Sequence, residues 1–171
     1  MGPQGSGKGT QGEKLAENFN IPFISTGDIY RRNVKLGTDI GKLAENVITK
    51  GELMSDEITR TIMQEELTEI TDGVIIDGYP RNIKQAQDLD NMLQVDYFIL
   101  LEVPNEITIK RISNRRSCKN GHIFNLISRK PKQEGVCDDD GEKLFIRDDD
   151  KSEYIKRRLE IYDKEDRKSV V

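Results

Sequence analysis

The chain has 171 residues, of which 34% are charged and 35% hydrophobic, and its formal net charge is −4. This length is typical of one compact domain with a small insertion, and the mild acidity argues against a nucleic-acid binder. No apolar run approaches the roughly 20 residues of a membrane helix, and no apolar signal segment opens the chain. Because its two cysteines also favour a reducing compartment, we expect a cytoplasmic protein that binds neither nucleic acid nor membrane.

Helical and strand patterns alternate along most of the chain. Apolar residues at helical spacing predict helices, and short continuous apolar runs predict buried strands. Such strands between helices indicate a parallel sheet covered on both faces, with ligands at the carboxyl ends of its strands. The predicted helices cover residues 9–19, 26–37, 39–51, 55–69, 82–93, 105–116 and 152–165, and the predicted strands cover 21–25, 73–77 and 96–103, the last being the strongest.

A segment of different composition interrupts this pattern. Residues 117–151 contain turns, both cysteines, and two acidic runs that end at Asp140 and Asp150. We interpret this segment as a small inserted subdomain.

The first residues have the spacing of a phosphate-binding loop. In Gly2-Pro3-Gln4-Gly5-Ser6-Gly7-Lys8, glycines would let successive N–H groups face an anion, and the following helix would add the positive end of its dipole. Lys8 would reach the terminal phosphates. The strict pattern has a hydroxyl residue directly after the lysine, whereas here Gly9 intervenes before Thr10. The alternative is a flexible glycine-rich tail.

A carboxylate and several arginines complete the candidate site. Asp77 ends a predicted strand, where it would hold a magnesium ion or, alternatively, cap a turn. Arg81 follows in the same turn. Planar guanidinium groups suit phosphate oxygens, although arginines on an exposed helix face are also common. Further arginines flank the inserted segment, namely Arg111, Arg115, Arg116, Arg147, Arg157 and Arg158. The one histidine, His122, is interpreted as a loop residue or a metal ligand.

Several separated motifs together resemble adenylate kinase. They are "GPQGSGKGTQ", "STGD" with Arg31 shortly after, "DGYPRNIKQA", "KRISNRR" and "IRDDD" followed by "KRRLEIY", in the order of that family. The resemblance runs from Gly2 to about Tyr162, and segment 117–151 resembles the long lid of the bacterial type. It implies a three-layer α/β P-loop fold with a core of residues 1–116 and 152–171, an AMP-binding helical segment at about 25–54, and a lid at 117–151.

The resemblance also implies an activity and its residues. The expected reaction transfers the terminal phosphoryl group of MgATP to AMP, giving two ADP, in a monomer. Its expected catalytic residues are Lys8, Asp77, Arg81, Arg115, Arg147 and Arg158. The implied ATP site comprises Gly5, Ser6, Gly7, Lys8, Gly9, Thr10, Arg115, Ile123 and Phe124. The implied AMP site comprises Thr26, Arg31, Glu52, Leu53, Met54, Gly78, Tyr79, Pro80, Arg81, Gln85, Arg147 and Arg158.

The lid departs from the pattern of the zinc-bearing family members, which carry two Cys-x-x-Cys-like pairs. Cys118 lacks a second cysteine beside it, so that Cys118, Cys137 and Asp140 give three ligands and His122 is a candidate for the fourth. Tetrahedral zinc needs four ligands. The sequence therefore favours a lid without metal, with hydrogen bonds in its place, and leaves zinc as the alternative.

The chain also differs from the family pattern at both ends. The expected first strand, in the middle of the sheet, would precede Met1, and the expected last strand and helix would follow Val171. We therefore expect a sheet that lacks these strands. An inactive nucleotide-binding remnant and a kinase that acts on UMP or CMP are the two alternative functions.

Overall fold

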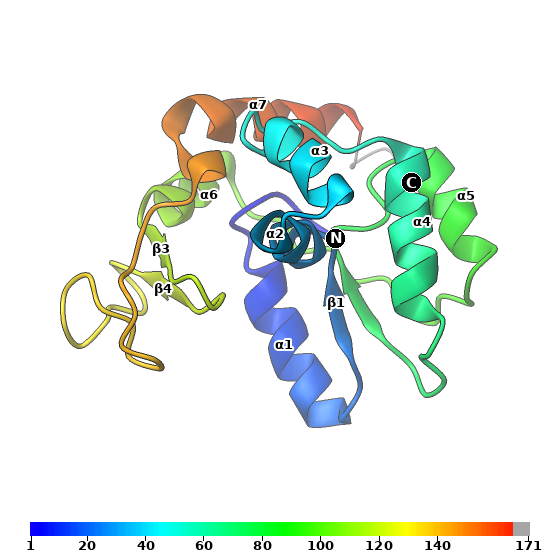
Figure 1. Ribbon diagram of the computed structural model, residues 1–171, viewed down its shortest axis with the longest axis horizontal. Coiled ribbons are helices and arrows are strands. Elements are labelled where there is room, and N and C mark those ends of the chain that lie inside the picture. Colours follow the sequence, from blue (N-terminus) through cyan, green and yellow to red (C-terminus); the bar gives the residue numbers. More distant parts are fainter. Residues whose placement is uncertain (166–171) are drawn as a thin grey trace.

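The protein, described by a computed structural model over residues 1–165, has a mixed α/β fold with a small parallel sheet (Figure 1). Strand β1 (Phe23–Ser25) pairs in parallel with β2 (Ile75–Asp77). Helix α1 (Lys8–Phe19) packs along both strands. Its first turn and the carboxyl ends of both strands lie at the same edge of the sheet, where the sequence predicted a ligand site.

Four helices form the main core together with β1 and the end of β2. They are α2 (Thr26–Leu36), α3 (Asp39–Ile48), α4 (Asp56–Leu67) and α5 (Ile83–Asp90). Each begins after a residue whose side chain accepts a hydrogen bond from a backbone N–H of the first turn: Ser25, Thr38, Ser55 and Asn82. Such caps satisfy N–H groups that have no partner within the helix. The helix predicted from residue 55 thus starts with Ser55 as its N-cap.

Two smaller clusters of buried residues hold the remaining elements. Helix α6 (Asn105–Ser113) packs against α7 (Ser152–Lys164) through Ile112, Ile155 and Leu159. The inserted segment forms a hairpin of β3 (Arg115–Ser117) and β4 (Ile123–Asn125), and the short 3-10 helix η1 (Asp148–Asp150) leads into α7. The inserted segment has its own core of Cys118, Phe124, Cys137 and Leu144. It projects from the end of the molecule opposite α4 and α5 (Figure 1).

The predicted strand at residues 96–103 was wrong. This segment is extended but forms no strand in the described part of the chain. Two hydrogen bonds tie it to Met1, whose ammonium donates to Ile99 O at 2.6 Å and whose carbonyl accepts from Leu101 N at 2.9 Å. To count as a β-strand, the segment would need a ladder of such bonds with a neighbouring strand along its whole length. Tyr97 is accordingly 89% exposed and Phe98 48%, although the apolar run predicted burial.

Other boundaries shift by a few residues. The predicted helix at 105–116 ends at Ser113, because residues 115–117 pair with β4 instead. The strands predicted at 21–25 and 73–77 are three residues long, while the remaining predicted helices are present. Residues 166–171, which the expected core includes, lie outside the described residues.

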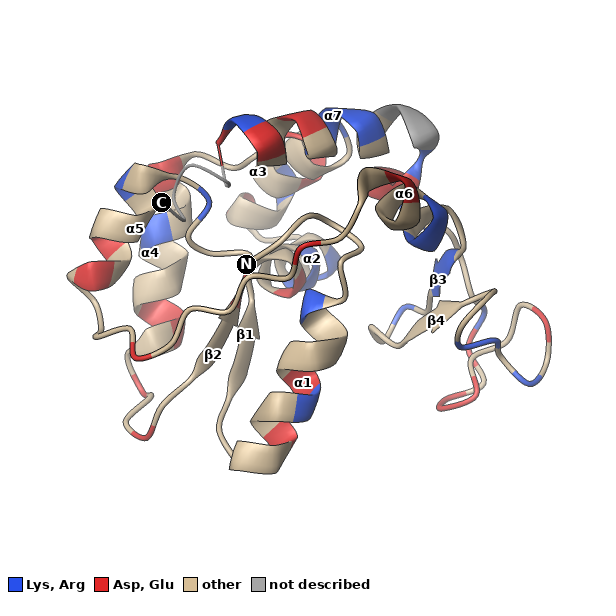
Figure 2. Cartoon of the chain, turned by 180° about the vertical axis from the view of Figure 1, so that it is seen from behind, with Lys and Arg blue, Asp and Glu red and all other residues tan. Residues whose placement is uncertain are grey.

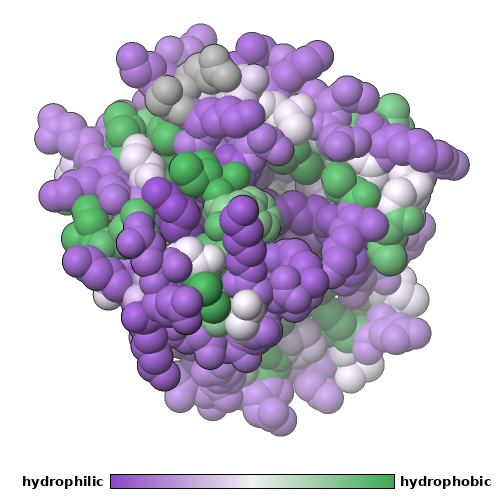
Figure 3. Space-filling model, turned by 60° about the vertical axis from the view of Figure 1, so that its left-hand side comes forward, coloured by the Kyte–Doolittle hydropathy of each residue, from purple (hydrophilic) through white to green (hydrophobic). Residues whose placement is uncertain are grey.

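The surface is charged and largely hydrophilic. Figure 2 shows basic and acidic residues interspersed along α4, α5, α7 and the inserted segment, rather than one basic stretch. Figure 3, with the lid end turned forward, shows mostly hydrophilic atoms and small separate apolar groups. In residues 1–165 no helix combines the length and the apolar character needed to cross a membrane.

The close approach of α2 and α3 makes Gly41 sensitive to substitution. A Cβ atom at Gly41 would lie 2.1 Å from the Asn33 carbonyl oxygen. Alanine gains about 1 kcal/mol of helix propensity over glycine, but a backbone clash of this kind costs about 1–3 kcal/mol. We expect Gly41→Ala to lower the free energy of unfolding, measured by urea denaturation. Asn46→Ala, on the exposed face of α3, is the control and should change it by less than about 0.7 kcal/mol. Equal stability of both variants would contradict the tight α2–α3 contact.

Candidate active site

A cavity of about 510 Å³ opens at the carboxyl ends of β1 and β2. This volume is within the usual range for small-molecule sites. Its walls come from the glycine-rich loop before α1, the start of α2, the segment between α3 and α4, the turn after β2, the lid hairpin and α7. Nearly all the predicted site residues line it: Gly5 to Thr10, Thr26, Arg31, Glu52 to Met54, Asp77, Gly78, Arg81, Gln85, Arg115, Ile123, Phe124, Arg147 and Arg158.

The glycine-rich loop has the backbone of an anion-binding site. Gly5 and Gly7 have φ of 79° and 105°, the left-handed region that other residues rarely adopt, and Gly7 is the N-cap of α1. The Lys8 ammonium donates to the Gly2 and Pro3 carbonyls at 2.6 and 2.9 Å, so it lies across the mouth of the loop. The Ser6 hydroxyl is buried and has no hydrogen-bond partner. The alternative of a flexible tail does not fit this ordered loop.

The turn after β2 is joined to the start of α2. The parallel register places Ser25 beside Asp77, and the next residue, Thr26, donates from Oγ1 to Gly78 O at 3.0 Å. Gly78 has φ of 82° and leaves no room for a side chain, since a Cβ would lie 2.6 Å from Thr26 Oγ1. Arg81 Nε donates back to Gly78 O at 2.8 Å, which holds the guanidinium over the cavity. One Asp77 oxygen, Oδ1, is buried and unpartnered.

Gln85 is held by two hydrogen bonds in the wall of the cavity. Its Oε1 accepts from Arg81 N at 2.8 Å, and its Nε2 donates to Asp56 Oδ1 at 2.7 Å. The residue is 2% exposed. A primary amide has two N–H donors and two acceptor lone pairs, so one of each is left for a ligand. Its expected contact with an adenine edge stays a prediction.

Buried carboxylates hold two of the cavity arginines. Arg115 makes a two-pronged contact with Asp150, with Nε donating to Oδ2 at 2.7 Å and Nη2 to Oδ1. Arg158 pairs with Asp149 through a single guanidinium nitrogen. Asp149 and Asp150 are 5% and 4% exposed. Such geometry fixes the direction of each guanidinium before a ligand arrives.

A third arginine, Arg147, has no carboxylate as a hydrogen-bond partner within the described part of the chain. Its Nε donates to Ser117 Oγ at 2.7 Å. Burial, with repulsion from Arg31 and Arg115, lowers the pKa of Arg147 to about 10. The group still carries its charge at neutral pH. Arg31, Arg115 and Arg147 thus repel one another around one cavity, and this repulsion favours a ligand with several negative charges.

The expected AMP side is shaped by residues around α2 and the segment after α3. Arg31 forms an ion pair with Asp28 at 2.7 Å, and Glu52 pairs with Arg157 of α7 at 2.6 Å. Leu53 and Met54 also line the cavity. The Glu52–Arg157 pair therefore connects the helical segment to α7 beside the cavity.

The lid contributes one exposed and one buried apolar residue. Ile123 is 37% exposed, whereas Phe124 is 1% exposed and belongs to the core of the lid. The Arg129 guanidinium lies 5.0 Å from the centroid of the Phe124 ring. The expected contact of both residues with the ATP base stays a prediction, and Ile123 offers the larger accessible surface for it.

Some predicted residues lie outside the cavity wall. Tyr79 and Pro80 do not line it, and Tyr79 is buried in the main core instead. Arg116 bonds to the Ser113 and Arg115 carbonyls, and Arg157 bonds to Glu52, so neither reaches the cavity.

Sequence reasoning placed Arg111 only among the arginines that flank the inserted segment, and it missed the roles of Gln4, Asp149 and Asp150. Arg111 donates to the Ser6 carbonyl at 3.1 Å and lines the cavity beside the loop. Gln4 Nε2 donates to Asp150 Oδ1 at 3.2 Å, which links the loop to η1. Asp149 and Asp150 were interpreted only as part of an acidic run. The signal that the sequence offered for this role was their place in the "IRDDD" motif, two and three residues after Arg147.

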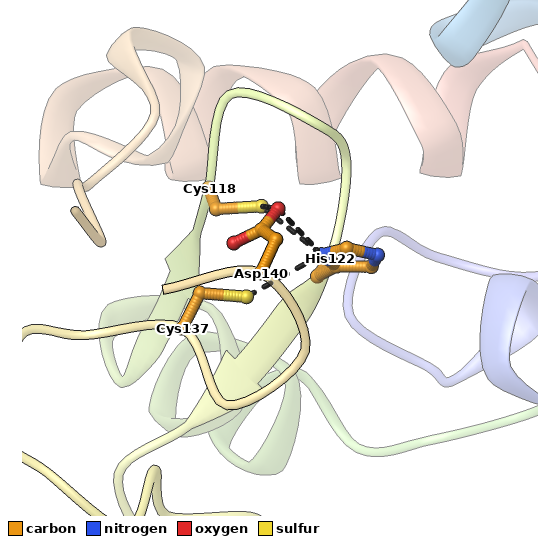
Figure 4. A group of neighbouring side chains, drawn as sticks. All are labelled: Cys118, His122, Cys137 and Asp140. Carbon is orange, nitrogen blue, oxygen red and sulfur yellow. Dashed lines mark hydrogen bonds and ion pairs between the residues drawn. The ribbon is translucent and has the colours of Figure 1, made fainter. Parts of the chain in front are cut away.

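Four lid residues form a separate cluster, which the cavity does not include. The ligand atoms of Cys118, His122, Cys137 and Asp140 lie within 4.8 Å of one another (Figure 4). Both cysteines are free thiols and buried. Burial, followed by the hydrogen bond with Asp140, raises the pKa of the Cys137 thiol, and the same hydrogen bond lowers the pKa of Asp140.

Comparison with known proteins decides between the possible meanings of this geometry. A family model described as adenylate kinase matches residues 1–171. An adenylate kinase of Streptomyces avermitilis is 46% identical over 95% of this chain and 78% of that protein. An adenylate kinase of Petrotoga mobilis is 47% identical over 96% of this chain and 79% of that protein.

The chain belongs to the adenylate kinase family. An adenylate kinase of Methanothrix thermoacetophila is 43% identical over 95% of this chain and 79% of that protein. This family membership confirms the resemblance deduced from the motifs and makes the chain a nucleoside monophosphate kinase, an enzyme of phosphoryl transfer.

The Asp149–Arg158 pair makes stability depend on pH. Burial raises the pKa of Asp149, but Arg158 and three further arginines outweigh it and lower the pKa in the folded protein. The unfolded chain therefore binds this proton at higher pH, and the stabilising contribution is complete above the unfolded pKa of about 3.9. It is lost progressively as the pH falls below that value.

We expect Asp149→Asn to lower the free energy of unfolding by about 3–5 kcal/mol at neutral pH, because Arg158 loses its buried partner. The difference from the parent protein should shrink as the pH falls below about 4. Urea denaturation at several pH values measures it. Asp148→Asn is the matched control, since Asp148 is exposed and pairs with exposed Lys151. A difference that stays constant with pH would show that Asp149 does not titrate as described.

Proposed function

We propose that this kinase transfers the terminal phosphoryl group of MgATP to AMP and releases two ADP. The observation that carries the proposal is the convergence of Lys8, Arg31, Arg81, Arg115, Arg147 and Arg158 on one cavity beside an anion-binding loop. These cations come from six separate parts of the chain. Two phosphate chains that meet end to end would bring the several negative charges that such an arrangement favours.

The two nucleotides would occupy opposite ends of the cavity. On this proposal the triphosphate of ATP lies on the loop from Gly5 to Thr10, with Arg115 and Arg147 beside its outer phosphates and its base against Ile123. AMP would lie between Arg31, the Glu52–Met54 segment and Gln85, with its phosphate near Arg81 and Arg158. The residues that line the cavity support both assignments.

Magnesium would enter as part of the MgATP substrate. The residues fit it, because the buried Asp77 Oδ1 and Ser6 Oγ have no partner in the described part of the chain. Carboxylate and hydroxyl oxygens, directly or through water, are the ligands that Mg²⁺ prefers. The ion would neutralise charge on the terminal phosphates.

The chain's own residues would act mainly by position and charge. A phosphate oxygen of AMP attacks the terminal phosphorus of ATP, a new P–O bond forms, and the bond to the bridging oxygen breaks, so that this oxygen leaves on ADP. The attacking oxygen is already anionic, and the reaction therefore needs no general base. This agrees with a described cavity lined by arginines and one lysine and without the single histidine.

We further propose that the helical segment at about 25–54 and the lid at 117–151 close over the nucleotides. Closure would exclude water, which would otherwise accept the phosphoryl group. The lid has its own core, and the helical segment contacts α7 through the Glu52–Arg157 pair. Both are therefore ordered units beside the cavity. That the protein acts as a monomer stays a prediction from the family resemblance.

A coupled assay of ADP formation tests the reaction. We expect turnover with MgATP and AMP, and far less with MgATP alone or with UMP or CMP as acceptor. Preference for UMP or CMP would support the pyrimidine alternative. Cooperative thermal unfolding without turnover on any acceptor would contradict the kinase proposal and support a nucleotide-binding remnant.

Lys8 provides the most direct test of the site. We expect Lys8→Ala to lower kcat by roughly 10²–10³-fold, the usual effect of removing one group that stabilises transition-state charge. Its thermal unfolding should stay close to that of the parent. Lys14→Ala, on the exposed side of the same helix, is the control and should keep full activity. A Lys8 variant as active as this control would remove Lys8 from the reaction.

A further inference from the structure

The amide group of Gln85 is held from both sides. Its Oε1 accepts a hydrogen bond from Arg81 N at 2.8 Å, and its Nε2 donates to Asp56 Oδ1 at 2.7 Å. Gln85 lines the cavity, whereas Asp56 lies behind it and does not. An effect of Asp56 on a bound ligand would therefore pass through Gln85.

The chemistry of these two partners allows the amide only one orientation. A backbone N–H can only donate, and an ionised carboxylate can only accept. If the amide turned by half a turn about its last side-chain bond, Nε2 would face the Arg81 N–H and Oε1 would face the Asp56 carboxylate. Two hydrogen bonds would become two repulsive contacts, and water could not replace them, because Gln85 is 2% exposed.

Asp56 is itself fixed where two helices begin. It is the first residue of α4, directly after the N-cap Ser55. Its Oδ1 also accepts from Asn82 Nδ2 at 2.9 Å, and Asn82, the N-cap of α5, accepts through its own Oδ1 from Gln85 N at 2.8 Å. One carboxylate oxygen thus joins the starts of α4 and α5 and holds the amide of Gln85.

A fixed amide distinguishes between purine bases. One N–H of Nε2 and one lone pair of Oε1 are already used, so one donor and one acceptor are left for a base. Adenine offers the complement, an amino group that donates beside a ring nitrogen that accepts. Guanine and hypoxanthine offer the reverse, a carbonyl oxygen that accepts beside a ring N–H that donates. An amide that is free to turn would serve either edge, whereas the amide of Gln85 serves only the first.

The same distinction applies to pyrimidines. Cytosine carries an amino group beside an accepting ring nitrogen, and uracil carries a carbonyl oxygen beside a donating N–H. The orientation of the amide therefore selects between amino bases and oxo bases, whatever the size of the ring.

We propose that Asp56 is a positioning residue that makes the monophosphate site prefer amino bases over oxo bases, by holding the Gln85 amide in one orientation. This inference rests on the proposed function, in which the acceptor base lies beside Gln85. Because Asp56 lies outside the cavity wall, its loss should alter the choice of acceptor more than the rate of phosphoryl transfer.

Steady-state kinetics with a matched pair of acceptors test the proposal. Inosine monophosphate (IMP) differs from AMP only at the edge that the amide would contact. We expect Asp56→Ala to lower the ratio of kcat/KM for AMP to that for IMP by roughly ten- to hundredfold, the usual effect of one hydrogen bond to a charged group. The KM for AMP should rise and that for IMP should fall, while kcat for AMP changes little.

Two further variants of α4 grade and control this effect. Asp56→Asn keeps an acceptor oxygen but can also turn to present its N–H groups, so its ratio should lie between those of the parent and Asp56→Ala. Glu57→Gln removes one negative charge from the same turn, but Glu57 is exposed and pairs with exposed Lys84 at 2.6 Å. This control should keep the ratio of the parent.

A double-mutant cycle tests whether Asp56 acts through Gln85. Gln85→Ala should lower the ratio of AMP to IMP by itself, because it removes the group that contacts the base. Adding Asp56→Ala to Gln85→Ala should then change the ratio no further, since the two residues form one interacting unit.

Three results would overturn the proposal and leave the proposed function intact. They are turnover of AMP with the same ratio in Asp56→Ala as in the parent, an equal loss for both acceptors, and a further change of the ratio in the double variant. The second would give Asp56 a role in folding alone. If Asp56→Ala fails to fold, the ratio of Asp56→Asn against that of Glu57→Gln decides.

Failure of the proposed function would show in the parent protein. If pyrimidine monophosphates are its preferred acceptors, the proposed function is wrong, and the ratio of CMP to UMP tests Asp56 in the same way. If no acceptor supports turnover, calorimetric binding of AMP and IMP to the parent and Asp56→Ala supplies the ratio. Binding of neither nucleotide would overturn both proposals.

Discussion

The active-site region depends on how buried carboxylates hold a group of mutually repelling arginines. Arg115 and Arg158 enter the cavity from the base of the lid and from α7, and each is fixed by one aspartate of η1. Without these partners, burying several guanidiniums together would be costly. With them, the charge is only partly neutralised, because Arg147 has Ser117 rather than a carboxylate beside it. An anionic substrate would neutralise the remaining positive charge.

The same interactions connect parts of the chain that are distant in sequence. Gln4 of the phosphate loop donates to Asp150, which also holds Arg115 at the start of the lid. Asp149, its neighbour in η1, holds Arg158 of α7. The loop, the lid and the last described helix therefore meet at η1.

The lid itself is built on a different principle. Its core contains only a few apolar residues, and a hairpin of this size is marginally stable by itself in water. The cluster around His122 supplies the additional constraint, with or without a metal. It lies apart from the cavity, so the inserted segment can be stabilised without using the residues that line the cavity.

Local patterns and separated motifs were enough to predict most elements and most of the residues that line the cavity. The caps, the amphipathic helices and the glycine-rich loop depend on neighbouring residues, and the comparisons confirm the family that the motifs indicated. The predictions failed where contacts with residues distant in the sequence decide the secondary structure. Residues 96–103 have strong strand propensity but lack the ladder that would make them a strand, and residues 115–117 leave a helical pattern to pair with β4.

The sequence by itself determined the glycine-rich loop, the set of arginines and the family, because these follow from residue types at short spacings. Only the tertiary structure decided that Asp149 and Asp150 hold those arginines, that Gln85 is anchored by Asp56, and that His122 faces two cysteines. Each of these depends on where a side chain points after distant segments have packed. Spacing along the chain carries no information about that direction.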